Sequence, residues 1–247
     1  MKNAISVILT TLMVMFLMGC AAPGNPAGGT NITNGTQGAY NPEIPANFAA
    51  RIDNQYYPLT PGSRWAYEGT TNGERERNEV IVTNQTKTIL GVTTTVIVDR
   101  VWDQEGDLKE ETYDWYAQDA EGNVWYFGED AKEYDNGQVI STEGSWEAGK
   151  DGALPGMIMK VRPVVGESWR QEYLSGVAED MAEVLGLSES VAVPSGAYSN
   201  CIKTKDWTPL QPDVIENKYY CPGVGVVLSE MVAGGSERME LAVFETG

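Results

Sequence analysis

The sequence predicts an all-β protein made of two related antiparallel β-meander units. Segments rich in β-branched and aromatic residues alternate with short polar turns, as in TTTVIVDRVW followed by DQEGD. Landmark residues recur in the same order in both halves of the chain. The segment with helical spacing, SGVAEDMAEVLGL, aligns with a strand of the other half, so we expect a strand after Asp180. The two units should form a curved sheet, a half-barrel or a sandwich.

Residues 1–19 are expected to be a signal peptide. Lys2 precedes an apolar run at 4–18, which is shorter than the about 20 residues that a membrane span needs. The LMGC at 17–20 resembles the lipobox of bacterial lipoproteins. This resemblance implies cleavage before Cys20, a diacylglycerol on its thiol and an acyl chain on its amino group, and several acyl chains give stable anchoring.

The lipid anchor places the protein in the cell envelope, outside the cytoplasm. Residue 21, directly after the lipidated cysteine, is alanine and not aspartate. By resemblance to Gram-negative sorting, this favours the outer membrane over the inner membrane in such a host. Residues 20–47 are rich in Gly, Pro, Asn and Thr and carry almost no charge. Such a segment buries too little apolar surface to fold, so we expect a flexible tether.

An internal repeat divides the rest of the chain. GSRW at 62–65 recurs as GESW at 166–169, and each unit then has a glycine 11 residues before a tryptophan, namely Gly91 before Trp102 and Gly196 before Trp207. Ordered landmarks at matching spacing indicate a duplication. The repeats are expected at 48–128 and 162–247, with an inserted Gly-rich loop region at 129–161 that can cover a groove between them.

Each unit is expected to fold as strands joined by Gly- and Asn-containing turns. The expected strands are 64–68, 78–83, 93–102, 108–118 and 124–128, followed by 168–174, 181–187, 190–193, 198–207, 214–221, 224–232 and 238–244.

Cys201 and Cys221 are predicted to form a disulfide, because an even pair in an exported protein meets oxidising conditions. Strands on either side of TPLQPD at 208–213 would place them opposite each other across a hairpin. The repeat aligns them with Val96 and Ala117, so the same hairpin is expected in the first unit without a sulfur bridge.

Charge and composition exclude several classes of function. The chain has 35 acidic and 17 basic residues, a net charge of −18, and removal of Lys2 with the leader makes it more negative. Such a surface repels nucleic acid and anionic headgroups, so membrane contact should depend on the lipid anchor. The chain has no histidine, which excludes a Ser-His-Asp triad and most zinc sites. No catalytic residue is predicted.

Calcium is the one cofactor that the sequence suggests. Carboxylates alternate around the glycine turn after Trp102, and calcium prefers several oxygen ligands. The candidate ligands are Asp103, Glu105, Asp107 and Glu110. The spacing is not that of an EF-hand, and a hairpin turn that needs polar residues explains the same pattern.

The aromatic middle of the chain is the candidate ligand groove. On the strand TYDWYAQD, Tyr113 and Trp115 share one face, and Asp114 and Tyr116 share the other. One face should belong to the core, and the other can line an apolar or sugar-stacking groove. The candidate groove residues are Trp115, Trp125, Tyr126 and Trp146.

The stretch ETYDWYAQDAEGNVWYFGED and the segment KYYCPGVGVV resemble exported bacterial and archaeal proteins of uncharacterised function. In those proteins alanine usually stands where this chain has Cys221. The resemblance covers most of residues 55–232 and implies a β-rich lipoprotein, with no activity and no catalytic residue to carry over. We therefore expect a non-enzymatic binding or envelope-assembly lipoprotein with a groove between the repeats, whose partner is an envelope protein, a lipid or a glycan. The alternatives are a calcium-stabilised surface protein and a glycan hydrolase that uses carboxylates.

Overall fold

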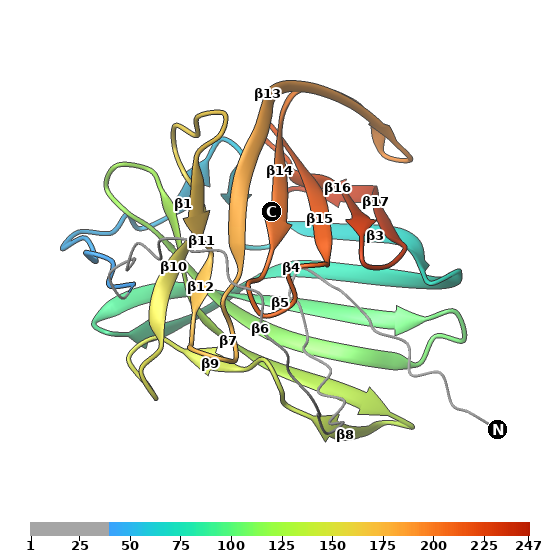
Figure 1. Ribbon diagram of the computed structural model, residues 1–247, viewed down its shortest axis with the longest axis horizontal. Helices are drawn as coiled ribbons and strands as arrows, with labels where there is room; N and C mark the ends of the chain where they lie inside the picture. The colour runs from blue at the N-terminus through green and yellow to red at the C-terminus, as the bar shows by residue number, and fades with distance from the viewer. Residues whose placement is uncertain (1–39) are drawn as a thin grey trace, which may run out of the picture.

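The structure is a computed structural model that describes residues 40–247. Every regular element within these residues is a β-strand (Figure 1), so the predicted all-β class is confirmed. None of the described residues forms a helix that is long and apolar enough to cross a membrane. The signal peptide, Cys20 and most of the expected tether lie outside the described residues.

The first unit is a meander of five antiparallel strands, each paired with the next along the chain. They are β3 (Arg64–Thr71), β4 (Glu74–Ile89), β5 (Val92–Asp103), β6 (Leu108–Gln118) and β7 (Val124–Asp135). Asn72 and Gly73 join β3 to β4 with φ angles of 52° and 88°. A two-residue hairpin turn of this kind needs positive φ at both positions, which Asn and Gly tolerate well.

The second unit repeats this order of strands. They are β11 (Ser168–Arg170), β13 (Met181–Val193), β14 (Gly196–Trp207), β15 (Ile215–Cys221), β16 (Gly225–Ala233) and β17 (Glu237–Glu245). The predicted strands at 181–187 and 190–193 are one strand, β13, and the residues just before Asp180 form turns. The strand that we expected after Asp180 is therefore present.

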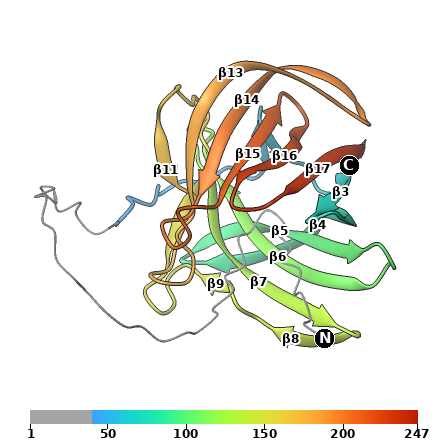
Figure 2. The same ribbon diagram turned by 45° about the vertical axis from the view of Figure 1, so that its right-hand side comes forward.

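The two units join at both ends into one curved sheet. β17 pairs with β3, and β10 (Leu154–Met159) pairs with both β7 and β12 (Glu172–Tyr173). β11 and β12 stand at the two opposite ends of the strand order, yet a single residue separates them in the chain. The sheet is thus nearly closed around its interior (Figure 2).

Three short pairings complete the fold. β1 (Ile52–Asn54) and β2 (Tyr57–Leu59) form a separate hairpin, while β8 (Gln138–Ser141) and β9 (Trp146–Glu147) pair with β7.

The beginnings of the two units are held by matching backbone hydrogen bonds. The amide of Gly62 donates to the carbonyl of Val82 on β4, and the amide of Gly166 donates to the carbonyl of Val184 on β13, both at 2.8 Å. The order β3-β4-β5-β6-β7 in one unit corresponds to β11-β13-β14-β15-β16 in the other. The two units therefore share this strand order and these bonds.

Residues 129–161, which the sequence analysis treats as a Gly-rich loop region, contain the end of β7 and the strands β8, β9 and β10. Glycine serves strand packing here. A Cβ atom on Gly156 in β10 would lie 2.1 Å from the carbonyl oxygen of Gln171. Other glycines of this region, such as Gly137 and Gly152, have positive φ angles of 73° and 85° and no atom near the place of a Cβ. Because β8, β9 and β10 all pair with β7, this region is part of the sheet.

The first hairpin forms as the repeat predicts, but in another register. Thr95 lies opposite Tyr116, so Ala117 faces Thr94 one step further along. The prediction that Ala117 faces Val96 is wrong by two residues. The reason is that the β5–β6 pairing carries a register shift between Val101 and Trp102, beside its turn, whereas no shift interrupts the β14–β15 pairing, and a sequence alignment does not reveal this difference.

Candidate functional site

A pocket lies between the two units, inside the curved sheet. Its empty space is about 790 Å³ when the open solvent at its mouth is counted. The first unit contributes residues from β3, β4, β5 and β6, the hairpin before it contributes β2, and the second unit contributes residues from β15, β16 and β17. We call it the central pocket. Because both units build it, the pocket exists only when the two repeats are joined.

Aromatic side chains form much of the wall of the central pocket. They are Tyr57, Trp65, Tyr67 and Tyr116. The indole N–H of Trp65 donates to the carbonyl of Val224 at 2.7 Å, and the hydroxyl of Tyr67 donates to the carbonyl of Val226 at 2.9 Å. These two bonds tie β3 of the first unit to the second unit and fix both rings in place.

Trp169 occupies in the second unit the place that Trp65 has in the first. Its indole N–H also donates to a backbone carbonyl, that of Met157 on β10, at 2.7 Å. In both units the recurring tryptophan thus stabilises the fold through a hydrogen bond to a backbone carbonyl.

Two carboxyl groups on neighbouring strands face the central pocket. Asp99 on β5 is 7% exposed and Asp114 on β6 is 4% exposed. Asn78 donates a hydrogen bond to Asp99, and Tyr126 donates to Asp114 Oδ1 at 2.7 Å. Burial raises the pKa of Asp114 to about 7, while burial, together with Asp114, raises the pKa of Asp99 well above its ordinary range.

A further buried carboxyl group, that of Glu129, lies behind the pocket wall. The hydroxyl of Tyr126 lies 2.7 Å from Asp114 Oδ1 and 2.9 Å from Glu129 Oε2. Burial, and then the charges of Glu172 and Asp114, raise the pKa of Glu129 well above its ordinary range. The other oxygen of Glu129, Oε1, is buried and has no hydrogen-bond partner among the described residues. Burial therefore favours the protonated form of these carboxyl groups.

Lys218 on β15 is the cation of the central pocket. Its Nζ lies 3.2 Å from Asp206 Oδ2 and 3.2 Å from Glu216 Oε2, and the residue is 5% exposed. The Asp206 contact has ion-pair distance without hydrogen-bond geometry, so it acts through charge alone. Burial disfavours the charge, but Glu216 and Asp206 outweigh it and raise the pKa of Lys218, which stays charged.

None of the four aromatic residues proposed for a ligand groove lines the central pocket. All four belong to the buried core. The indole of Trp125 donates to Asp119 Oδ2 at 2.8 Å, and that of Trp146 donates to Glu172 Oε2 at 3.0 Å. Tyr126 supports Asp114 from behind, and Lys87 Nζ lies 3.2 Å from the ring centroid of Trp115.

The four carboxylates proposed as calcium ligands are not brought together. Asp103 accepts hydrogen bonds from the amides of Glu105 and Asp107 and pairs with Lys109 at 3.0 Å, which stabilises the turn itself. Glu110 is buried and accepts from Thr112. Within residues 40–247 no three such side chains are placed to hold a metal ion.

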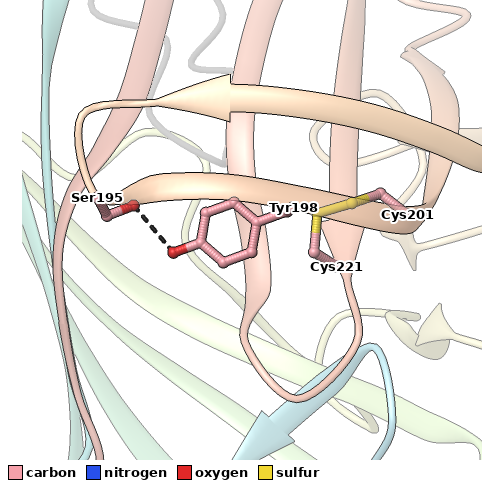
Figure 3. The surroundings of a disulfide bond; sticks show 4 residues. All are labelled: Ser195, Tyr198, Cys201 and Cys221. Carbon is pink, nitrogen blue, oxygen red and sulfur yellow. Dashed lines mark hydrogen bonds between the residues drawn. A yellow bond between two sulfur atoms is a disulfide. The ribbon is translucent and has the colours of Figure 1, made fainter.

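The predicted disulfide is present. Cys201 lies in the middle of β14 and Cys221 at the end of the neighbouring strand β15, with Cα atoms 4.2 Å apart (Figure 3). Tyr198 lies beside it on β14, and its hydroxyl is 3.0 Å from Ser195 Oγ.

Asp99 is a pocket residue that the sequence-based predictions do not include, although the chain carries a signal for it. Asp99 is a lone acid at the end of TTTVIVD, inside a strand of β-branched residues. An acid in such a strand must be buried with partners or face a cavity. For β6, the pair Asp114 and Tyr116 was recognised as one face, and it is this face that lines the pocket.

Two solved structures are similar to this one. A Bacteroides fragilis protein provisionally described as exported, with a YmcC-like fold, is 14% identical, with a TM-score of 0.47, covering 78% of this chain and 100% of that one. A Parabacteroides distasonis protein provisionally described as a lipoprotein is 13% identical, with a TM-score of 0.45, covering 78% of this chain and 99% of that one. No protein-family model matches the sequence, and no curated protein matches it.

Proposed function

We propose that the mature protein is an exported, lipid-anchored binding protein whose central pocket takes a small ligand. The observation that carries this proposal is the pocket, which both units build from aromatic rings and a few buried charged groups. Small-molecule sites are typically concave and mostly apolar, with a small number of polar groups that orient the ligand. The leader and Cys20 support export and anchoring, and Ala21 favours the outer membrane in a Gram-negative host.

A binding role fits the carboxyl groups better than glycan hydrolysis does. An acid–base pair needs two carboxyl groups whose pKa values are pushed apart, so that one is protonated while the other is ionised. In the central pocket burial raises the pKa of both Asp99 and Asp114. Neither is held as the ionised partner.

Native mass spectrometry of protein purified from its own host tests the pocket. Val80 lines the pocket and is partly exposed, while its neighbour Ile81 on β4 does not line it. Phenylalanine at 80 should fill the pocket, whereas phenylalanine at 81 serves as the matched control. We expect an added small-molecule mass on the wild type and on Ile81→Phe, and none on Val80→Phe. A bare wild-type mass, or a ligand retained by folded Val80→Phe, would contradict the proposal.

Anchoring is tested by Cys20→Ser in a chain whose leader is still cleaved. The strongly negative surface supplies no second membrane signal. The variant should leave the membrane fraction and remain folded, as judged by an unchanged melting temperature. Retention of the cleaved variant in the membrane fraction would contradict lipid anchoring.

A further inference from the structure

Asp99 is a buried acid whose carboxyl group faces the central pocket without a counter-ion. Among the described residues, its one hydrogen bond comes from Asn78, and no lysine or arginine lies within ion-pair distance of it. At 7% exposure it has little access to water. A buried carboxylate is costly unless it is paired or protonated, so Asp99 either keeps a proton or meets a cation from outside.

Lys218 is not the counter-ion of Asp99. It lines the same pocket, but its ammonium group is already held between Asp206 and Glu216 at 3.2 Å each. Asp114, which is 4% exposed, also has no ion pair and accepts from Tyr126 instead. The side of the pocket formed by β5 and β6 therefore has two carboxyl groups and no cation.

The aromatic residues around these carboxyl groups narrow the ligand class. Trp65, Tyr67 and Tyr57 line the pocket together with Asp99. Aromatic faces attract cations, and organic ammonium groups in proteins are commonly held by aromatic rings beside a carboxylate. A bare metal ion is a poorer fit, since no described group of three acids is placed to ligate one.

We propose that the ligand of the central pocket is a small organic ammonium ion, with its charge at Asp99 and its alkyl groups against Trp65 and Tyr67. This inference rests on the proposed function and specifies its substrate class. Beside a neutral ligand such as a sugar, Asp99 would have to keep its proton, whereas an ammonium ion supplies the counter-ion that its carboxylate lacks among the described residues.

Choline and its uncharged isostere 3,3-dimethyl-1-butanol test the charge directly. The two have the same shape, so a neutral aromatic pocket would bind them alike. We expect choline to perturb tryptophan fluorescence with a dissociation constant below about 10 mM, and the isostere to bind at least about tenfold more weakly. Tetramethylammonium should behave like choline. Equal affinity for choline and the isostere, or binding of neither ammonium ion below about 10 mM, overturns the inference.

Asp99→Asn keeps the size of the side chain and removes the charge. It should weaken choline binding at least about tenfold, because the counter-ion is lost. Asp103→Asn, a change at the turn end of the same strand and outside the pocket, is the matched control and should leave binding unchanged. Unchanged affinity in folded Asp99→Asn contradicts the inference. If native mass spectrometry shows a neutral ligand that Val80→Phe removes, the proposed function stands and only the ammonium assignment fails.

Discussion

Removal of the positive charge of Lys218 should destabilise the protein strongly. Lys218→Met keeps a similar volume and leaves Asp206 and Glu216 buried without their cation, where they lay 3.2 Å from Nζ. Breaking a buried ion pair by removing one partner costs about 3–5 kcal/mol. Since domains of this kind have a total free energy of unfolding of about 5–15 kcal/mol, the change should be large.

The direction in which the pKa of Lys218 is shifted determines the pH at which Lys218→Met and the wild type should be compared. The pKa of Lys218 is raised in the folded state, so its contribution is fully present below the unfolded pKa of a lysine and is lost only as pH rises through the folded value. Urea unfolding followed by tryptophan fluorescence at neutral pH therefore measures the whole effect.

Two companion variants sharpen the test. Lys132→Met removes a surface pair in which Nζ lies 2.8 Å from Asp130, with side chains 29% and 49% exposed, and should cost less than about 1 kcal/mol. Adding Glu216→Gln to Lys218→Met removes one uncompensated charge and should recover part of the lost stability. A Lys218→Met cost as small as that of Lys132→Met, or no recovery in the double variant, would refute the buried-pair reasoning.

Three further predictions follow from the interior and the repeat. Replacing both Cys201 and Cys221 by serine should lower the free energy of unfolding by about 3 kcal/mol, because the bridge closes a loop with a sequence separation of 20; an unchanged urea midpoint would contradict this. Burial raises the pKa of Asp114 from 3.8 to about 7. Between these values the folded chain keeps a proton that the unfolded chain releases, so this residue's contribution to stability falls as pH rises from about 4 to about 7. Asp114→Asn should therefore gain stability relative to the wild type over that range, and parallel pH profiles of the urea midpoint would exclude the shift. Thr94→Cys with Ala117→Cys should form a disulfide, detected by mass and by loss of free thiols, because these residues correspond in register to the natural pair; persistent free thiols in the folded variant would argue against the structural repeat.

Local pattern was enough to predict most of the strands. β6 has the predicted bounds, because its alternating residues lie between two glycine-containing turns. The disulfide was predictable because a hairpin places positions at equal distance from its turn opposite each other, and this relation needs no knowledge of the tertiary fold.

The identity of the pocket wall depends on how the whole sheet curves. On β6 the sequence separates Trp115 from Asp114 and Tyr116, but it does not tell which face turns inward. Both faces are buried here, so hydrophobicity gives no answer. The sequence also does not tell that Asp99 and Lys218 line one pocket, because they lie more than a hundred residues apart and belong to different units.

The most direct test of a ligand site between the two repeats is an electron-density map of crystals of the protein purified from its own host. We predict density for a small molecule in the central pocket, in contact with Tyr67 and with the carboxyl group of Asp99. A well-ordered pocket that contains only water, in protein shown by mass to have kept its lipid anchor, would contradict the proposed binding role.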